Sequence, residues 1–163
     1  MPKKLKVGDK APEFCLPDAN NKKVCIDEFR GRWLVLYFYP RDNTSGCTKE
    51  AVDFTANVKD FKKMNAAVVG VSPDSVTSHM NFISKHDLEV ILLSDPEHKV
   101  LEEYGVWQKK SMYGREYYGV VRTTFVIDPK GKIKQKWEKV KVAGHADAVK
   151  DFVGVSCQRP MKK

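Results

Sequence analysis

Apolar residues follow two different patterns along the chain, and each pattern predicts a different element. Residues 33–39 are a continuous apolar run of seven, rich in aromatic side chains, and residues 66–72 form a second, largely apolar run. Runs of this kind are typical of strands buried on both faces of a sheet. Between them, from residue 51 to 61, apolar residues recur at every third or fourth position, as on a helix that lies against a sheet. The alternation of strand and helix predicts parallel β-α-β pairing.

The remaining segments complete an α/β fold. Turn residues at 17–21 separate two short alternating stretches and predict an N-terminal β-hairpin. We expect residues 107–118, which are polar, to form a connection without regular structure. The predicted fold is a mixed sheet flanked by helices, with the N-terminal hairpin outside it. The other predicted elements are a helix from Asp74 or Ser75 to His86, a strand at 90–93, a short helix after Asp95-Pro96 that Gly105 ends, a hairpin of strands 120–128 and 132–137, and a helix at 145–153.

Length and composition indicate one ordinary globular domain spanning residues 1–163, with a basic, mobile tail at about 155–163. The hydrophobic share of 42% excludes a disordered chain. No apolar run approaches the about 20 residues of a membrane-spanning helix, and residues 1–9 lack the apolar stretch of a signal peptide, so we expect a cytoplasmic protein without a membrane partner. The net charge of +8 is spread in clusters with few aromatic residues between them, which predicts no specific nucleic-acid partner.

One cysteine occupies a position that favours chemistry. Cys47 follows the strand predicted at 33–39 across the polar turn 41–46, and it lies in the first turn of the next helix. In open α/β sheets, reactive groups gather beyond the carboxyl ends of the strands. The amino end of a helix also stabilises the thiolate, which is the nucleophilic form of cysteine. The position therefore predicts a reactive thiol rather than an inert core residue.

Residues 38–51 read FYPRDNTSGCTKEA and contain the pattern Pro40-x-x-x-Thr44-x-x-Cys47. This pattern resembles the active-site signature of peroxiredoxins, specifically the bacterioferritin-comigratory or Q-type branch. Residues 8–14, 70–74 and 122–128 resemble further motifs of the family, so the similarity covers nearly the whole chain. The resemblance implies a thioredoxin-like fold, a monomer, and an antioxidant enzyme that reduces hydrogen peroxide and organic hydroperoxides without a metal or organic cofactor.

The resemblance also implies a role for each site residue. Cys47 is the peroxidatic nucleophile, and Pro40, Thr44 and Arg122 complete its pocket. Arg122 keeps its charge at any physiological pH, so it can stabilise both the thiolate and the charge on the leaving oxygen. The Thr44 hydroxyl can accept a hydrogen bond from the peroxide and donate one to the sulfur. Pro40 shields the thiolate from bulk water.

Regeneration of the enzyme is the open part of the prediction. Attack on peroxide leaves a sulfenic acid on Cys47, which a second thiol must resolve. The usual resolving positions of the family hold Val52 in one branch and Ile83 and Ser84 in the other, so both intramolecular routes are missing. Cys157, in the predicted tail, is the alternative resolving residue. We expect an external thiol instead, from thioredoxin, glutaredoxin or a low-molecular-weight thiol.

Two further cysteines, Cys15 and Cys25, face away from the apolar side of the predicted N-terminal hairpin and stand across from one another. They are close enough to pair, but in a reducing cytoplasm two free thiols are the expectation. The histidines are assigned to helix surfaces or caps: His79, His86, His98 and His145.

Other functions of a reactive cysteine fit the sequence less well. A thioredoxin-type disulfide exchanger needs Cys-x-x-Cys, and position 44 is threonine. A cysteine phosphatase needs an arginine six residues after the nucleophile, where this chain has Asp53. A zinc site needs clustered ligands, and the cysteines are widely spaced. A basic binding module or holdase without turnover remains as the non-enzymatic alternative.

Overall fold

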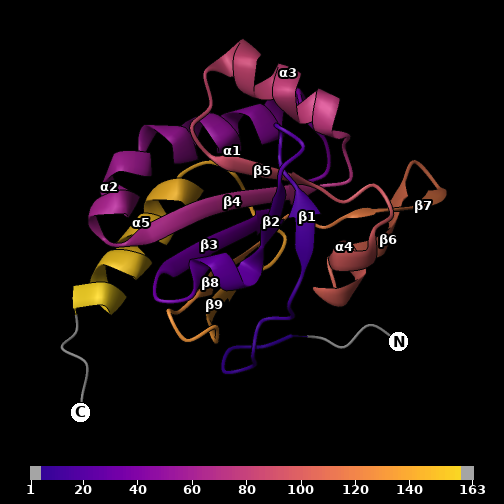
Figure 1. Cartoon of the computed structure of the whole chain (residues 1–163). Helices are drawn as coiled ribbons and strands as arrows, with labels where there is room; N and C mark the ends of the chain where they lie inside the picture. The colour runs from indigo at the N-terminus through magenta and orange to yellow at the C-terminus, as the bar shows by residue number, and fades with distance from the viewer. Residues whose placement is uncertain (1–4, 159–163) are drawn as a thin grey trace.

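The computed structural model describes residues 5–158, and its centre is a five-stranded sheet with the order β5-β4-β3-β8-β9 (Figure 1). The strands β3 (Trp33–Phe38), β4 (Ala66–Ser72) and β5 (Ile91–Ser94) run parallel to one another. The strands β8 (Thr123–Ile127) and β9 (Ile133–Trp137) are antiparallel to their neighbours. The predicted mixed sheet is confirmed. Its middle strand is β3, whose side chains are buried on both faces of the sheet, as the apolar run predicted.

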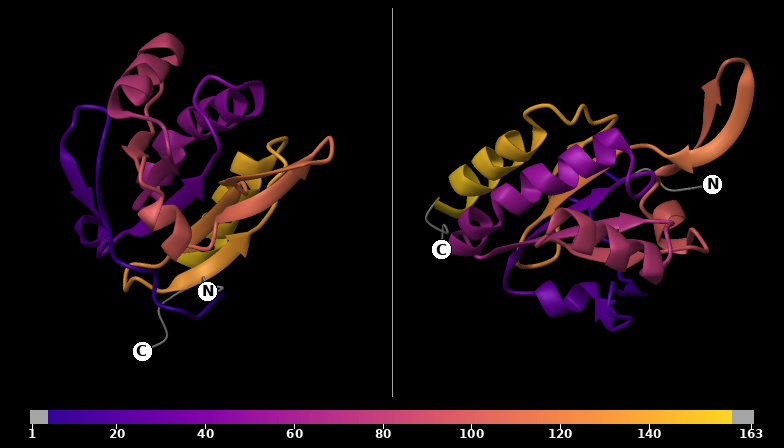
Figure 2. Two further views of the ribbon diagram at one scale, coloured as in Figure 1. Left: turned by 90° about the vertical axis from the view of Figure 1, so that its right-hand side faces the viewer. Right: turned by 90° about the horizontal axis from the view of Figure 1, so that it is seen from above.

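Helices cover one face of the sheet, and the second view in Figure 2 shows α1 and α5 lying together on that face. The apolar positions predicted to face inward between residues 51 and 61 are all buried. Asn57 interrupts the predicted helix and divides it in two. Among residues 5–158, none of the helices is long and apolar enough to cross a membrane. The helices of this layer are α1 (Ser45–Ala56), α2 (Val58–Lys63), α3 (Val76–His86) and α5 (His145–Gln158).

The predicted N-terminal hairpin is present, and it lies on the opposite face of the sheet (Figure 1). Its inward side chains, Phe14, Leu16, Val24 and Ile26, join a second core cluster with the other face of β3. This arrangement leaves Cys47 in the helix-side cluster, on the far side of the sheet from the hairpin. The elements of this layer are β1 (Cys15–Pro17), β2 (Lys23–Cys25), the short helix η1 (Ile26–Phe29) and α4 (Lys99–Glu103).

The connection predicted without regular structure at residues 107–118 is wrong. These residues form a second hairpin, β6 (Trp107–Met112) and β7 (Arg115–Val120), which stands away from the body of the molecule (Figure 2). Most of its side chains are exposed on both faces, so the sequence carries no alternation of apolar and polar residues to indicate strands. As a consequence, Arg122 lies in the link between β7 and β8 and not within a strand.

The last helix is longer than predicted. The apolar pattern indicated an end near residue 153, but α5 continues to Gln158. Cys157 is therefore part of a helix and not of a tail that follows it. Of the predicted tail, residues 155–158 are helical, and residues 159–163 lie outside the described part of the chain.

The expectation of two free thiols in the N-terminal hairpin is also corrected, because Cys15 and Cys25 form a disulfide. The two residues are register partners in β1 and β2. In this hairpin Ile26 N donates a backbone hydrogen bond to Phe14 O, and Asp18 N donates one to Lys22 O. Hydrogen-bonded and non-hydrogen-bonded pairs alternate along two antiparallel strands, and the Cys15–Cys25 pair is next to the hydrogen-bonded pair Phe14–Ile26. Cys15 and Cys25 therefore form a pair without backbone hydrogen bonds, where facing side chains come closest. The local geometry brings the sulfur atoms together, and Cys15 is exposed to solvent.

Replacing Cys15 by serine is expected to destabilise the protein. The disulfide closes a loop of ten residues, and a crosslink of this span contributes about 2–3 kcal/mol by restricting the unfolded chain. For a domain of this size we expect the melting temperature to fall by about 5–10 °C, measured calorimetrically without reductant. Dithiothreitol should lower the melting temperature of the wild type by a similar amount and leave the Cys15→Ser/Cys25→Ser variant unchanged. Equal melting temperatures for the oxidised wild type and the double variant would contradict this prediction.

Candidate active site

The loop between β3 and α1 delivers Cys47 to the amino end of the helix. Thr44 is the N-cap residue, with an extended backbone, and its carbonyl accepts the first helical hydrogen bond from Thr48 N at 2.8 Å. Cys47 is the third residue of α1, so it lies in the first turn, where backbone N–H groups are unpaired. Its side chain is only 1% exposed. The thiol is thus held in a largely dry site at the positive end of a helix.

Arg122 faces the sulfur directly. Its Nη2 donates a hydrogen bond to Cys47 Sγ at 3.2 Å, and its Nη1 donates one to Glu50 Oε1 at 2.6 Å. The backbone of the link holds Arg122 in place, because Val140 N donates to its carbonyl at 3.0 Å. Gly46 makes room for the guanidinium, since a Cβ at this position would lie 3.2 Å from Nη2. One cation therefore serves two buried groups that can carry negative charge.

The pKa values of Arg122 and Glu50 are both raised. Burial opposes the charged form of Arg122, but the charges of Glu50 and Cys47 outweigh this and raise its pKa. Burial raises the pKa of Glu50 from 4.5 to about 7, and the nearby guanidinium offsets this only in part. Glu50 Oε2 is buried without a hydrogen-bond partner among residues 5–158, which adds to the cost of its charge. When Glu50 is protonated it no longer neutralises Arg122, so the attraction between the guanidinium and a negatively charged sulfur is stronger.

A buried histidine lies close enough to the same arginine to be affected by its charge. His145, at the start of α5, is 6% exposed, and its Nε2 lies 2.8 Å from the hydroxyl of Thr124. Burial, helped by the positive charge of Arg122, lowers the pKa of His145 from 6.5 to about 4. His145 is therefore neutral in the folded protein at physiological pH.

Glu50 and His145 give opposite pH dependences of stability. Between pH 4.5 and 7 the folded state keeps a proton on Glu50 that the unfolded chain has lost, so stability falls as pH rises. Between pH 4 and 6.5 His145 is protonated in the unfolded chain but neutral in the folded protein, so stability rises with pH. Each effect amounts to about 3 kcal/mol across its window.

Because the two windows overlap, we expect the wild type to vary little in stability from pH 5 to 7. His145→Gln should lose stability as pH rises over this range, and Glu50→Gln should gain it. Urea unfolding at pH 5 and pH 7 measures both slopes. Slopes of the same sign in the two variants would show that this assignment is wrong.

The structure brings together only part of the predicted site. Cys47 and Arg122 are in contact, as the resemblance implied. The Thr44 hydroxyl donates its proton to the carbonyl of Arg41 at 2.9 Å rather than to the sulfur, which leaves its lone pairs for an acceptor role. Pro40 is half-buried at the end of β3, next to this loop. At the positions that hold resolving cysteines in relatives, Val52 is exposed on α1, Ile83 is half-buried on α3 and Ser84 is exposed.

Sequence reasoning missed three buried polar residues near Cys47. Glu50 lies three residues after Cys47, a spacing that places both on one face of a helix and could have indicated that they share a partner, as they do in Arg122. Asp42 and His79 pair across 37 residues of sequence, and nothing in the local pattern shows this. The assignment of His79 and His145 to helix surfaces or caps is wrong, because both are buried. His98 occupies the N-cap position of α4 through its backbone, whose carbonyl accepts a hydrogen bond from Glu102 N, and His86 is the last residue of α3.

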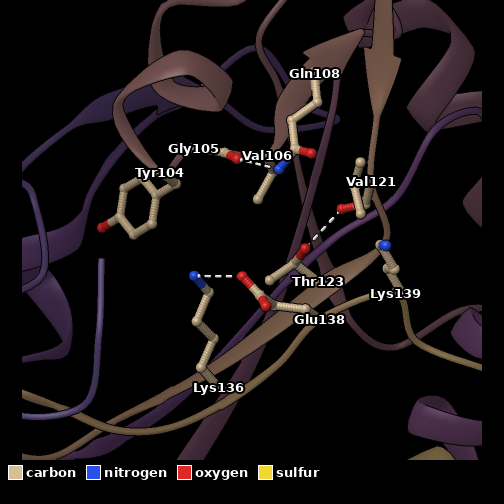
Figure 3. A pocket seen from close by; sticks show the side chains of 9 residues that line it. All are labelled: Tyr104, Gly105, Val106, Gln108, Val121, Thr123, Lys136, Glu138 and Lys139. Atoms are coloured by element: carbon tan, nitrogen blue, oxygen red, sulfur yellow. Dashed lines mark hydrogen bonds and ion pairs between the residues drawn. The ribbon is translucent and has the colours of Figure 1, made fainter. Parts of the chain in front are cut away.

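A separate hollow of about 420 Å³ lies at the start of β8, on the side away from Cys47 (Figure 3). Val121 and Thr123 line it, whereas Arg122 between them points to Cys47, as expected where successive side chains alternate in direction. The polar groups around it bond one another, for example Lys136 to Glu138 at 2.8 Å. The hollow contains none of the predicted site residues. Its lining consists of Tyr104, Gly105, Val106, Gln108, Val121, Thr123, Lys136, Glu138 and Lys139.

A buried cysteine at a helix start, facing a guanidinium beyond the end of a central strand, has the surroundings expected of a reactive thiol on an α/β sheet. Residues 7–136 match the model of the AhpC/TSA family. The chain belongs to this family, and its relatives are peroxiredoxins of the Bcp and Q type. It is therefore a thiol-dependent peroxidase, which acts on peroxide and is regenerated by a thiol.

The individual relatives cover nearly the whole chain. Peroxiredoxin Bcp of Bacillus subtilis is 42% identical over 153 residues, which is 93% of this chain and 98% of that protein. Peroxiredoxin Bcp of Escherichia coli is 39% identical over 149 residues, or 91% and 96% of the two chains. Among solved structures, the bacterioferritin comigratory protein of Xanthomonas campestris has a TM-score of 0.85 at 40% identity, covering 89% of this chain and 92% of that one. A PrxQ mutant of Xylella fastidiosa has a TM-score of 0.91 at 33% identity, covering 96% and 99%. The predicted thioredoxin-like fold is confirmed.

Proposed function

We propose that Cys47 is the nucleophile of this peroxidase and that Arg122 stabilises its charge. The observation that carries the proposal is the hydrogen bond of 3.2 Å from Arg122 Nη2 to Cys47 Sγ in a site that is almost closed to solvent. In the proposed step the thiolate attacks one peroxide oxygen, the O–O bond breaks, and the sulfur becomes a sulfenic acid. The other oxygen leaves as hydroxide or alkoxide and takes up a proton to give water or an alcohol.

The surrounding residues support this step in different ways. The guanidinium of Arg122 can stabilise negative charge first on the sulfur and then on the leaving oxygen. The hydrogen bond from its Nη1 to Glu50 holds it in position during this step. The Thr44 hydroxyl donates its hydrogen bond to the backbone carbonyl of Arg41. The lone pairs of its oxygen are therefore available to accept a hydrogen bond from the peroxide. Pro40 limits the access of water to the loop. These roles for Thr44 and Pro40 are proposals supported by their positions on either side of the loop.

The substrates proposed are hydrogen peroxide and small organic hydroperoxides. The X. campestris relative is described as having alkyl peroxide reduction activity. Reduction of the sulfenic acid is assigned to an external thiol, because no cysteine stands at the usual resolving positions and Cys15 and Cys25 are bonded to each other. Thioredoxin, glutaredoxin or a low-molecular-weight thiol would supply it. A monomeric state and a cytoplasmic location stay predictions.

Intact-mass analysis after one equivalent of peroxide tests the proposal. We expect the fully reduced wild type and the Cys157→Ser variant both to gain one oxygen atom, located on Cys47 by peptide mapping. A loss of two hydrogen atoms in the wild type that is absent from Cys157→Ser would show instead that Cys157 resolves the sulfenic acid. Oxygen gained elsewhere in the chain, with Cys47 unmodified, would contradict the proposed nucleophile.

A further inference from the structure

The loop that carries the active site contains a buried carboxylate that does not touch the sulfur. Asp42 lies between Pro40 and Thr44, and it is 6% exposed. The Tyr39 hydroxyl donates to its Oδ1 at 2.6 Å, and the Ser78 hydroxyl donates to its Oδ2 at 2.7 Å. His79 Nδ1 lies 2.7 Å from the same Oδ2. Both oxygens of the carboxyl group therefore accept a hydrogen bond from a neighbouring hydroxyl, an arrangement that favours the carboxylate form.

His79 carries the compensating charge. It is completely buried, and its Nε2 lies 2.9 Å from the carbonyl oxygen of Leu93. A carbonyl oxygen only accepts, so Nε2 carries a hydrogen atom. Nδ1 faces the carboxylate of Asp42, another acceptor, so it carries one as well. The geometry therefore assigns a positive imidazolium to His79 and a buried ion pair to His79 and Asp42.

The pair ties the active-site loop to two other parts of the fold. His79 lies on α3, and Leu93 belongs to β5. The backbone of the loop is also fixed, because Asp42 N donates to Asp74 Oδ2 at 2.8 Å, and Ser72 donates its hydroxyl to the same oxygen at 2.7 Å.

The ligand atoms of Asp42, Asp74 and His79 lie within 4.8 Å of one another, but hydrogen-bond partners already face them. We interpret the group as a hydrogen-bond network and not as an open metal site. We call Tyr39, Asp42, Asp74, Ser78 and His79 the Asp42 network.

Closure of the loop creates a problem for the second half of the reaction. With Cys47 only 1% exposed, a peroxide is small enough to enter, but a thiol must approach the sulfur in line to form a disulfide. A reductant protein cannot do this while α1 and its loop remain in place. The loop must therefore open before an external thiol reaches the oxidised sulfur.

We propose that the Asp42–His79 ion pair is the positioning contact that holds residues 40–47 in the peroxide-reactive conformation, and that this pair separates when the loop opens to the reductant. The proposal rests on the function proposed for Cys47. It makes Asp42 and His79 positioning residues, which act on the reaction through the loop and touch neither peroxide nor sulfur. Their removal should affect the two half-reactions in opposite directions, because peroxide needs the closed loop and the thiol needs the open one.

Two rates measured on the full chain in a Cys157→Ser background test this. The first is the second-order rate of Cys47 with hydrogen peroxide, and the second is the labelling rate of Cys47 by a bulky maleimide, which needs the loop open. For His79→Leu we expect the first to fall and the second to rise, each by about tenfold, the factor that loss of a charged hydrogen bond gives. The matched control is His86→Gln, a histidine on the same helix outside the network, which should change neither rate more than about twofold.

A double variant separates the ion pair from a general loss of packing. His79→Leu leaves the Asp42 charge buried and unpaired, which is strongly unfavourable, whereas Asp42→Asn/His79→Leu leaves no charge. We therefore expect the double variant to recover part of the peroxide rate lost in His79→Leu. If His79→Leu does not fold, the double variant compared with wild type should show the same two shifts at smaller size.

The proposal is overturned if both rates stay unchanged or if both move in the same direction. Failure of the proposed function would appear differently. In that case wild type would consume peroxide independently of Cys47, while the maleimide rates would still report whether the Asp42–His79 pair keeps the loop closed.

Discussion

Replacing Cys47 by serine is expected to reduce peroxide consumption to the uncatalysed background, a loss of about 10³-fold or more. The serine hydroxyl is nearly the size of the thiol, so the packing of α1 against the sheet should be preserved. It is not ionised at neutral pH, however, and the guanidinium of Arg122 then faces a neutral oxygen that is a poor nucleophile. Peroxide loss in the presence of a thiol reductant measures the effect.

The matched control for this substitution is Cys15→Ser/Cys25→Ser. This variant removes two sulfur atoms from the opposite side of the sheet and should keep the reaction with peroxide. Thermal unfolding of Cys47→Ser should confirm that it remains folded. If Cys47→Ser retained most of the wild-type rate while the hairpin variant lost it, the hairpin and not the α1 cysteine would be the reactive site.

Replacing Arg122 by methionine is expected to lower the rate with peroxide by about 10²–10³-fold, because it removes the donor that stabilises charge on the sulfur and on the leaving oxygen. Arg122→Lys should recover only part of this loss. A single ammonium group cannot reproduce the two fixed directions in which the guanidinium bonds Glu50 and Cys47. The rate with peroxide and the rate of alkylation of Cys47 by iodoacetamide should fall together.

Lys49→Met separates this effect from a general loss of positive charge. Lys49 lies on the same helix, is exposed, and pairs with Asp53 at 3.1 Å. A screened surface charge of this kind contributes little, so we expect a change of less than about threefold. A loss in Lys49→Met as large as that in Arg122→Met would mean that the overall field of the protein, and not the contact with sulfur, governs reactivity.

The fold was predictable where burial leaves a pattern in the sequence. The run at residues 33–39 identifies β3 because both of its faces are covered, and β4 agrees with prediction to the residue for the same reason. The β6–β7 hairpin was missed, since most of its side chains are exposed and its strands carry no alternation of apolar and polar residues. The end of α5 was missed because the apolar pattern stops before the helix does.

Of the candidate site, the sequence pointed to the partners Cys47 and Arg122 but not to the geometry around them. Family resemblance selected Cys47 and Arg122, which are 75 residues apart and in contact. The direction of the Thr44 hydroxyl depends on a turn of the backbone around Arg41, and composition does not encode it. The pairing of Asp42 with His79 depends on how α3 lies over the loop, which is a property of the assembled sheet.

The exposed disulfide of the N-terminal hairpin affects how this protein has to be handled in the laboratory. Any thiol added to sustain turnover can also exchange with an accessible cystine. Enzyme studied during catalysis and enzyme purified in air would then be two different covalent forms. Melting curves, crystals and shelf-life data collected on one form should not be transferred to the other until the number of titratable sulfhydryl groups has been counted in each buffer.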